Sequence, residues 1–78
     1  MMYEIRAIFG NKDRALEIKS IFSNLKKISK KYIDILPEVE EYSHGTYCFY
    51  IHTDFIEVYD LVDQIVKACD GATFVRAI

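Results

Sequence analysis

The sequence holds few of the residues that interrupt regular structure or cross-link a chain. Three glycines and one proline among 78 residues leave no linker, low-complexity tract or internal repeat. Two cysteines, Cys48 and Cys69, are too few for a disulfide framework, and no Cys/His spacing indicates structural zinc. No apolar run approaches the roughly 20 residues of a membrane-spanning helix. These absences predict a single domain, residues 1–78, in a reducing compartment.

The first residues also lack the uninterrupted apolar segment of a secretory signal. Glu4 and Arg6 stand where that segment would lie, so we expect a cytoplasmic protein that keeps its first residues. The chain is 51% hydrophobic and 28% charged, which is typical of an ordinary globular domain rather than a disordered segment.

Charge is unevenly distributed along the chain. Residues 1–31 hold eight Lys/Arg against three Asp/Glu, whereas residues 32–78 hold two against nine, which together give the net charge of −2. The one basic cluster closes the first predicted helix and consists of Lys26, Lys27, Lys30 and Lys31. A solvated helix face is the favoured interpretation, because a negative net charge opposes binding to phosphates. Nucleic-acid binding through this basic first helix is kept as an alternative.

Apolar periodicity predicts four strands and two helices. Strands have every second residue apolar, and helices have apolar residues three and four positions apart. The predicted strands are residues 2–9, 32–42, 46–53 and 72–78, and the predicted helices are residues 11–30 and 54–68. Local signals at the ends of these elements are Asn11 as an N-cap, Pro37 as an interruption of the second strand, Ser43-His44-Gly45 as a hairpin turn, Asp54 with Glu57 as a capping box, and Gly71 as a C′ residue.

The element order, βαββαβ, resembles that of ferredoxin-like domains over the whole chain. The resemblance implies an α+β fold, a four-stranded antiparallel sheet with two helices on one face. It implies no function, because this topology hosts unrelated activities.

RNA-recognition motifs of this topology carry stacking rings on the two central strands. On the third predicted strand, Thr46 and Cys48 occupy the positions of those rings. The apolar residues Tyr47, Phe49 and Ile51 have the opposite parity and face the predicted core. We therefore expect no RNA-stacking platform of that kind.

No constellation of catalytic or metal-binding residues stands out. Cys48 and His52 share a strand face, but four residues at about 3.3 Å each separate them by roughly 13 Å, too far for a nucleophile and its base. The loop after Phe9 has one glycine and an opposing Asp13, so it lacks the glycine-rich anion-binding loop of the acylphosphatases, which share this topology. The sequence predicts a protein that is no enzyme and has no catalytic residue, metal or cofactor.

The most site-like set of side chains lies on the predicted outward face of the sheet. Alternation along the first and third strands places five side chains there: Glu4, Arg6, Cys48, Tyr50 and His52. The set is either a polar patch that meets a ligand or partner, or an ordinary solvated sheet face with cross-strand pairs.

The edges of the sheet offer further candidate contact surfaces. The second strand carries Pro37 and acidic residues, as protected edges do, whereas the last strand carries one charge and no proline. A protein partner would contact Glu38, Glu40, Glu41 and Tyr42 near the former, or Phe74, Val75 and Ile78 on the latter. A homodimer through the C-terminal strand is the alternative arrangement.

Together these observations predict a non-catalytic protein-binding module that regulates or inhibits a larger protein partner. Its small size alone suggests a phage or another mobile element as the source. One alternative is a small-molecule-sensing regulatory domain that dimerises edge to edge. The other is the nucleic-acid binder described above.

Overall fold

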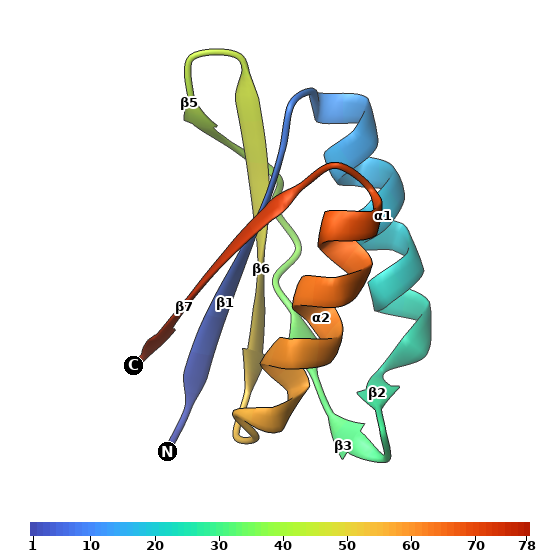
Figure 1. The fold of residues 1–78 in the computed structure, drawn as a ribbon, viewed down its shortest axis with the longest axis vertical. Coiled ribbons are helices and arrows are strands. Elements are labelled where there is room, and N and C mark those ends of the chain that lie inside the picture. Colours follow the sequence, from blue (N-terminus) through green and yellow to red (C-terminus); the bar gives the residue numbers. More distant parts are fainter.

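The computed structural model describes all residues 1–78 as two helices packed against an antiparallel sheet (Figure 1). The long central strands are β1 (Tyr3–Phe9) and β6 (Thr46–Thr53), and β7 (Ala72–Ala77) pairs with β1 at one edge. The other edge is divided between β4 (Asp34–Ile35) and β5 (Glu40–Ser43), which both pair with β6. Helices α1 (Lys12–Leu25) and α2 (Glu57–Ala68) lie on the same face of the sheet. Neither helix has the length and apolar character that crossing a membrane requires.

The core lies between the sheet and the helices, as the alternation of apolar residues predicts. In the β1–β6 ladder, Ile5 is opposite Ile51 and Ala7 is opposite Phe49, and all four side chains are buried. The Phe9 ring stacks against that of Phe49, with their centroids 6.0 Å apart. The helices cover this layer with the buried side chains of Ala15, Ile18 and Phe22 from α1 and Val58, Val62 and Val66 from α2.

Helix α1 begins where the sequence predicts and ends earlier. The side-chain oxygen of Asn11 accepts a hydrogen bond of 2.7 Å from the backbone N–H of Arg14, which confirms the N-cap. The helix ends at Leu25 rather than near residue 30, because Lys26 takes a left-handed conformation with φ 58°. The chain then forms a small hairpin of β2 (Lys27–Ile28) and β3 (Lys31–Tyr32).

The hairpin was missed because Ile28 continues the helical apolar spacing. In the structure Ile28 is buried from a strand instead, and it joins the same core as the α1 residues. Ser29 and Lys30 both have positive φ, 51° and 66°, which suits the two central residues of a tight hairpin turn. Apolar spacing alone does not distinguish these two ways of burying one isoleucine.

The second predicted strand, residues 32–42, is not continuous: Tyr32 belongs to β3 of the separate hairpin, and only β4 and β5 join the main sheet, which therefore has five strands rather than the predicted four. The strand is interrupted around Pro37, which separates β4 from β5, and Gly45 in the following turn has a positive φ of 81°. Strand β6 has the predicted bounds.

Both predicted signals at the ends of α2 are wrong in detail. No side chain caps the helix at Ile56, and it is the Thr53 hydroxyl that accepts a hydrogen bond from the N–H of Phe55. At the other end the left-handed residue is Asp70, with φ 62°, rather than Gly71. The N–H of Asp70 bonds to the carbonyl of Lys67, and the N–H of Gly71 bonds to that of Val66, which is a Schellman ending.

Gly71 is required for a different reason, the close approach of the chain to the core. A Cβ placed there would lie 2.6 Å from a methyl of Val66, 2.7 Å from the Phe9 ring and 2.8 Å from the carbonyl oxygen of Ile8. The last of these is backbone and cannot rotate away.

The variant Gly71→Ala tests this packing. We expect it to lower the free energy of unfolding by about 1–3 kcal/mol, the usual cost of overpacking a core. Gly10→Ala is the matched control, because a Cβ there meets nothing within 4 Å, and we expect little change. Urea unfolding of both variants measures the difference, and equal stabilities would contradict the close approach.

Candidate functional site

The sheet face away from the helices carries the candidate site. Strand pairing sets Glu4 beside His52 and Arg6 beside Tyr50, so four of the five predicted patch residues lie together. Cys48, the fifth, differs from the expectation of a solvated side chain because it is only 1% exposed. It is flanked by Ile8 on β1 and Glu40 on β5. Burial raises the pKa of the Cys48 thiol above its ordinary value of 9.0, which disfavours the reactive thiolate form.

Arg6 is held between two aromatic rings. Its guanidinium carbon lies 5.0 Å from the ring centroid of Tyr42 and 5.4 Å from that of Tyr50, within the range of cation–π attraction. The Tyr50 hydroxyl raises the pKa of Arg6, so the guanidinium stays charged. Its Nε is inaccessible to solvent and has no hydrogen-bond partner. The four ion pairs of the chain all join other residues, so no carboxylate neutralises Arg6.

Glu4 is in the opposite situation, because both of its oxygens are engaged. Arg76 donates from Nε and Nη2 to Oε1 at 3.0 Å, and His52 lies 3.1 Å from Oε2. Burial by itself raises the pKa of the Glu4 carboxyl. The hydrogen bonds with His52 and Arg76 outweigh that effect and hold the pKa below its ordinary value of 4.5.

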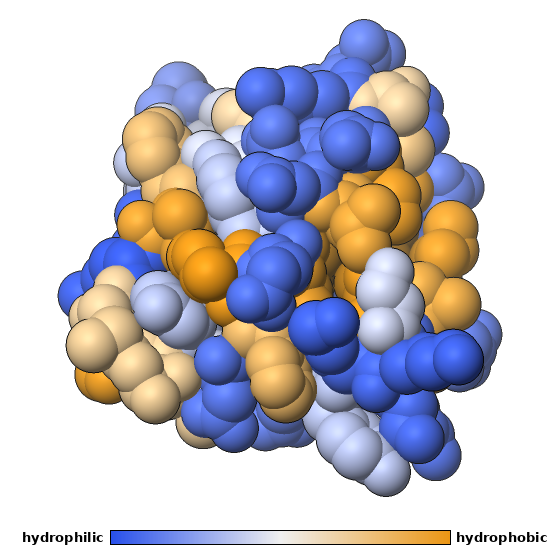
Figure 2. Space-filling model, turned by 60° about the horizontal axis from the view of Figure 1, so that its bottom comes forward, coloured by the Kyte–Doolittle hydropathy of each residue, from blue (hydrophilic) through white to orange (hydrophobic).

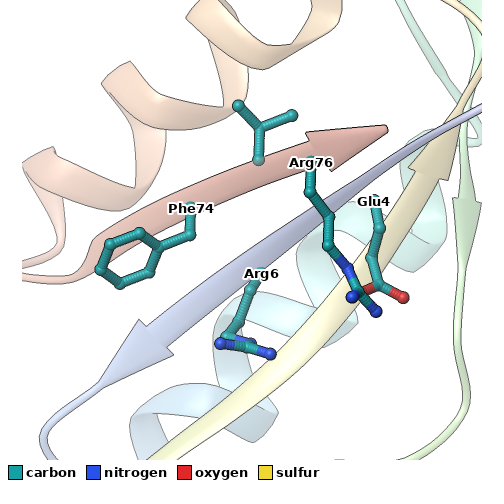
Figure 3. A pocket seen from close by; sticks show the side chains of 5 residues that line it. Glu4, Arg6, Phe74 and Arg76 are labelled. Atoms are coloured by element: carbon teal, nitrogen blue, oxygen red, sulfur yellow. The ribbon is translucent and has the colours of Figure 1, made fainter. Parts of the chain in front are cut away.

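Phe74 extends the aromatic row to the β7 edge. It is the strand neighbour of Arg6 and is 57% exposed. A small cavity of about 60 Å³ lies beside it, lined by Glu4, Arg6, Phe74, Val75 and Arg76 (Figure 3). Figure 3 shows the labelled side chains of β1 and β7 around this cavity, with the guanidinium groups of Arg6 and Arg76 at different points of its rim.

Arg76 is a member of this face that was not among the predicted site residues. The signal that identifies it is the two-residue spacing from Phe74, which gives both side chains the same parity on the last strand. Their pairing with Arg6 and Glu4 then follows from the register of β7 against β1.

The remaining predicted partner-binding residues lie at opposite edges of the sheet. Glu38, Glu40 and Glu41 are exposed at the β5 edge, and Tyr42 turns onto the open face against Arg6. On the β7 side Ile78 is 52% exposed, whereas Val75 is half-buried and packs against the core. The two predicted contact surfaces are therefore separate, and the row of Tyr42, Tyr50, Arg6 and Phe74 runs between them.

The four lysines of the basic cluster lie beyond α1, whereas the sequence pattern predicts them on the first helix. The helix stops at Leu25, so Lys26 is its C-cap residue, and Lys27, Lys30 and Lys31 lie on the β2–β3 hairpin. The ammonium of Lys27 lies 4.4 Å from the ring centroid of Tyr32, and that of Lys31 lies 5.9 Å from the ring of Phe55. None of the four forms an ion pair with a carboxylate.

Two open hollows lie near this hairpin, one on each side of Tyr32. They have volumes of about 400 and 290 Å³ and share Tyr32, Ile33 and Asp34 in their walls. Figure 2, turned to bring this end of the molecule forward, shows hydrophobic surface interrupted by hydrophilic side chains.

Comparisons with known proteins add no assignment. No protein-family model, curated protein or solved structure matches the chain.

No group of three or more His, Cys, Asp or Glu side chains is arranged to hold a metal ion. The open face is thus a surface of charged and aromatic groups that can bind an anionic or planar group.

The variant Glu4→Gln tests the ion-pair cluster through the pH dependence of stability. Because the folded-state pKa of Glu4 is depressed, its contribution is present above about pH 4.5 and is lost as pH falls through the lower folded-state value. We expect the variant to be less stable by about 1 kcal/mol at neutral pH and to decline less steeply below about pH 4.5. Urea unfolding over that pH range measures both effects.

Glu17→Gln is the control for this experiment. Glu17 pairs with Arg14 on the exposed surface of α1, where its side chain is 63% exposed, so we expect almost no change in stability or in its pH profile. An acid-side profile of Glu4→Gln identical to that of the wild type would contradict the account of the cluster.

Proposed function

We propose that this chain is a non-catalytic module that binds a larger protein and regulates or inhibits it, and that its arrangement is ferredoxin-like. Support for the arrangement comes from the strand order β4-β6-β1-β7, in which β1 and β6 are the central strands. The shared face of the two helices agrees with it (Figure 1). The binding proposal rests on one observation, the unpaired outer edge of β7.

The backbone of β7 offers hydrogen-bonding groups to an incoming strand. The N–H of Ile78 donates to the carbonyl of Met2 on the β1 side. In an antiparallel ladder successive residues turn their N–H and C=O groups to opposite sides. Phe74 and Arg76 therefore bond towards β1, while Thr73, Val75 and Ala77 direct their backbone groups outward. No other strand pairs with this side of β7.

The two edges of the sheet are protected to different degrees. The β4–β5 edge is broken at Pro37 and carries exposed Glu38, Glu40 and Glu41, devices that discourage strand pairing. Strand β7 has one charged residue, Arg76, which is already bound to Glu4. Its exposed apolar residue Phe74 adds contact area for a partner. An extended segment of another protein, added to β7, is the occupant that we propose.

The variant Ala77→Pro tests the edge. Proline removes an outward-facing N–H and leaves the donors that bond to β1 in place. We expect the tagged wild-type protein to capture a stoichiometric, nuclease-resistant protein from host lysate. Ala77→Pro should lose it while keeping a cooperative thermal unfolding transition.

The matched comparison reverses Glu38, Glu40 and Glu41 to lysine at the other edge. Capture retained by that variant and lost by Ala77→Pro assigns binding to β7, and the converse result assigns it to the acidic edge. If both variants retain the partner, neither surface is the binding site.

The competing functions give different results in the same experiments. A homodimer that light scattering detects in the wild type but not in Ala77→Pro would make a second copy the occupant, as the small-molecule-sensing alternative requires. Nuclease-sensitive capture that weakens steeply with salt, and is lost on replacing the four hairpin lysines, would favour nucleic-acid binding.

A further inference from the structure

From the cavity beside Phe74 we infer that the segment paired with β7 is acidic, and that one of its Asp or Glu side chains enters this cavity and binds Arg6. The inference rests on the proposed function, since a strand must pair with β7 to bring the side chain there. The inference adds the chemical character of the partner segment, because an unpaired strand edge by itself can pair with a segment of any composition.

Arg6 is the unneutralised charge of the open face. Both oxygens of Glu4 are already engaged, Oε1 by Arg76 and Oε2 by His52. Arg6 has tyrosines but no carboxylate beside it, and its Nε lacks an acceptor. A buried donor without an acceptor is unfavourable, and a carboxylate is the acceptor that a guanidinium binds best.

Only Tyr42 and Tyr50 hold the Arg6 guanidinium, and no carboxylate fixes its position. Cation–π contacts are less directional than the two charged hydrogen bonds that Arg76 donates to Oε1 of Glu4. The guanidinium can therefore turn towards the cavity when an acceptor arrives. Figure 3 shows the Arg6 side chain leaving β1 on the side away from β7, so the guanidinium has to turn to meet an acceptor that approaches over β7.

The dimensions suit an acidic side chain from an added strand. Such a strand lies about 4.8 Å outside β7, and β1 lies about 4.8 Å inside it, so roughly 10 Å separates the new backbone from that of Arg6. A glutamate extended inward and an arginine extended outward together cover this distance. The cavity of about 60 Å³ has room for a small polar group such as a carboxylate, since about 10–15 Å³ is enough for one water.

The pairing pattern also brings the incoming side chain close. Phe74 and Arg76 bond towards β1, so on the outer side they occupy non-hydrogen-bonded positions, where opposing side chains approach most closely. A residue opposite either one projects onto the open face beside the cavity. An acidic residue there also lies near the guanidinium of Arg76, whose side chain is 69% exposed.

Charge favours a peptide over a nucleic acid as the occupant. The face has one uncompensated cation, which matches one carboxylate, whereas a nucleic acid brings a phosphate with every nucleotide. The net charge of −2, with Glu38, Glu40 and Glu41 along the far edge, repels a chain of phosphates. An extended peptide also uses the outward backbone groups of β7, which bases and phosphates use less well.

The test is a selection from a displayed library of random linear decapeptides against the full-length protein, tethered through a long linker at Met1. We expect the enriched peptides to share an Asp or Glu at one position and apolar residues at alternate positions. Fluorescence anisotropy with a representative synthetic peptide then gives the dissociation constant. Arg6→Gln should weaken binding about 10- to 100-fold, as expected for the loss of a charged hydrogen bond.

Two further variants keep the result interpretable. Arg6→Lys retains the charge without the planar fork, so we expect it to weaken binding less than Arg6→Gln does. Arg14→Gln removes a guanidinium from the exposed surface of α1 and should leave the affinity unchanged. Thermal unfolding of each variant shows whether the fold is retained.

The outcomes separate this inference from the function on which it rests. Enriched peptides that carry no shared acid, yet are lost in Ala77→Pro, would overturn the acidic pocket and leave the edge proposal intact. The absence of any enriched peptide would count against both. Binding of a random single-stranded RNA that Arg6→Gln abolishes would overturn the peptide as the occupant.

Discussion

The pairing of β1 with β6 is the constraint on which the rest of the structure depends. These two long strands are central, and their register sets Ile5 against Ile51 on the buried face and Arg6 against Tyr50 on the open face. Side chains alternate between the two faces, so a slip of one residue would send the apolar set to solvent and the charges into the core. The burial of the core thus also fixes the composition of the open face.

The two arginines of the open face differ because of their distance from Glu4. Arg76 is opposite Glu4 in the β1–β7 ladder and donates two hydrogen bonds to it, while His52 takes the remaining oxygen from the β6 side. Arg6 is two residues farther along β1 and is surrounded by Tyr42, Tyr50 and Phe74. At the Glu4 end of the face the carboxylate is paired with cationic or hydrogen-bonding groups, whereas at the Arg6 end the guanidinium has no anionic partner.

The edges of the sheet bring that cation within reach of a second chain. Helices cover the opposite face, and β5 with its glutamates closes one side, so the approach along β7 is the least obstructed. A partner strand there would gain backbone hydrogen bonds for affinity and a charged pocket for selectivity. This combination suits a small binding module, because neither feature requires additional sequence.

Local patterns in the sequence determined most of the elements. Residues close together in the chain are enough to predict the alternation in β1 and β6, the cap at Asn11, the break at Pro37 and the turn at Gly45. The end of α1, the β2–β3 hairpin and the burial of Cys48 were decided by tertiary structure, since Ile28 and Cys48 become buried only through residues distant in the chain. The same holds for the site. Alternation predicted that one face carries Glu4, Arg6, Tyr50 and His52. Only the β1–β7 register placed Arg76 opposite Glu4 and left Arg6 without a carboxylate. Ion pairs of this kind form across strands, so they depend on which strands become neighbours in the tertiary structure.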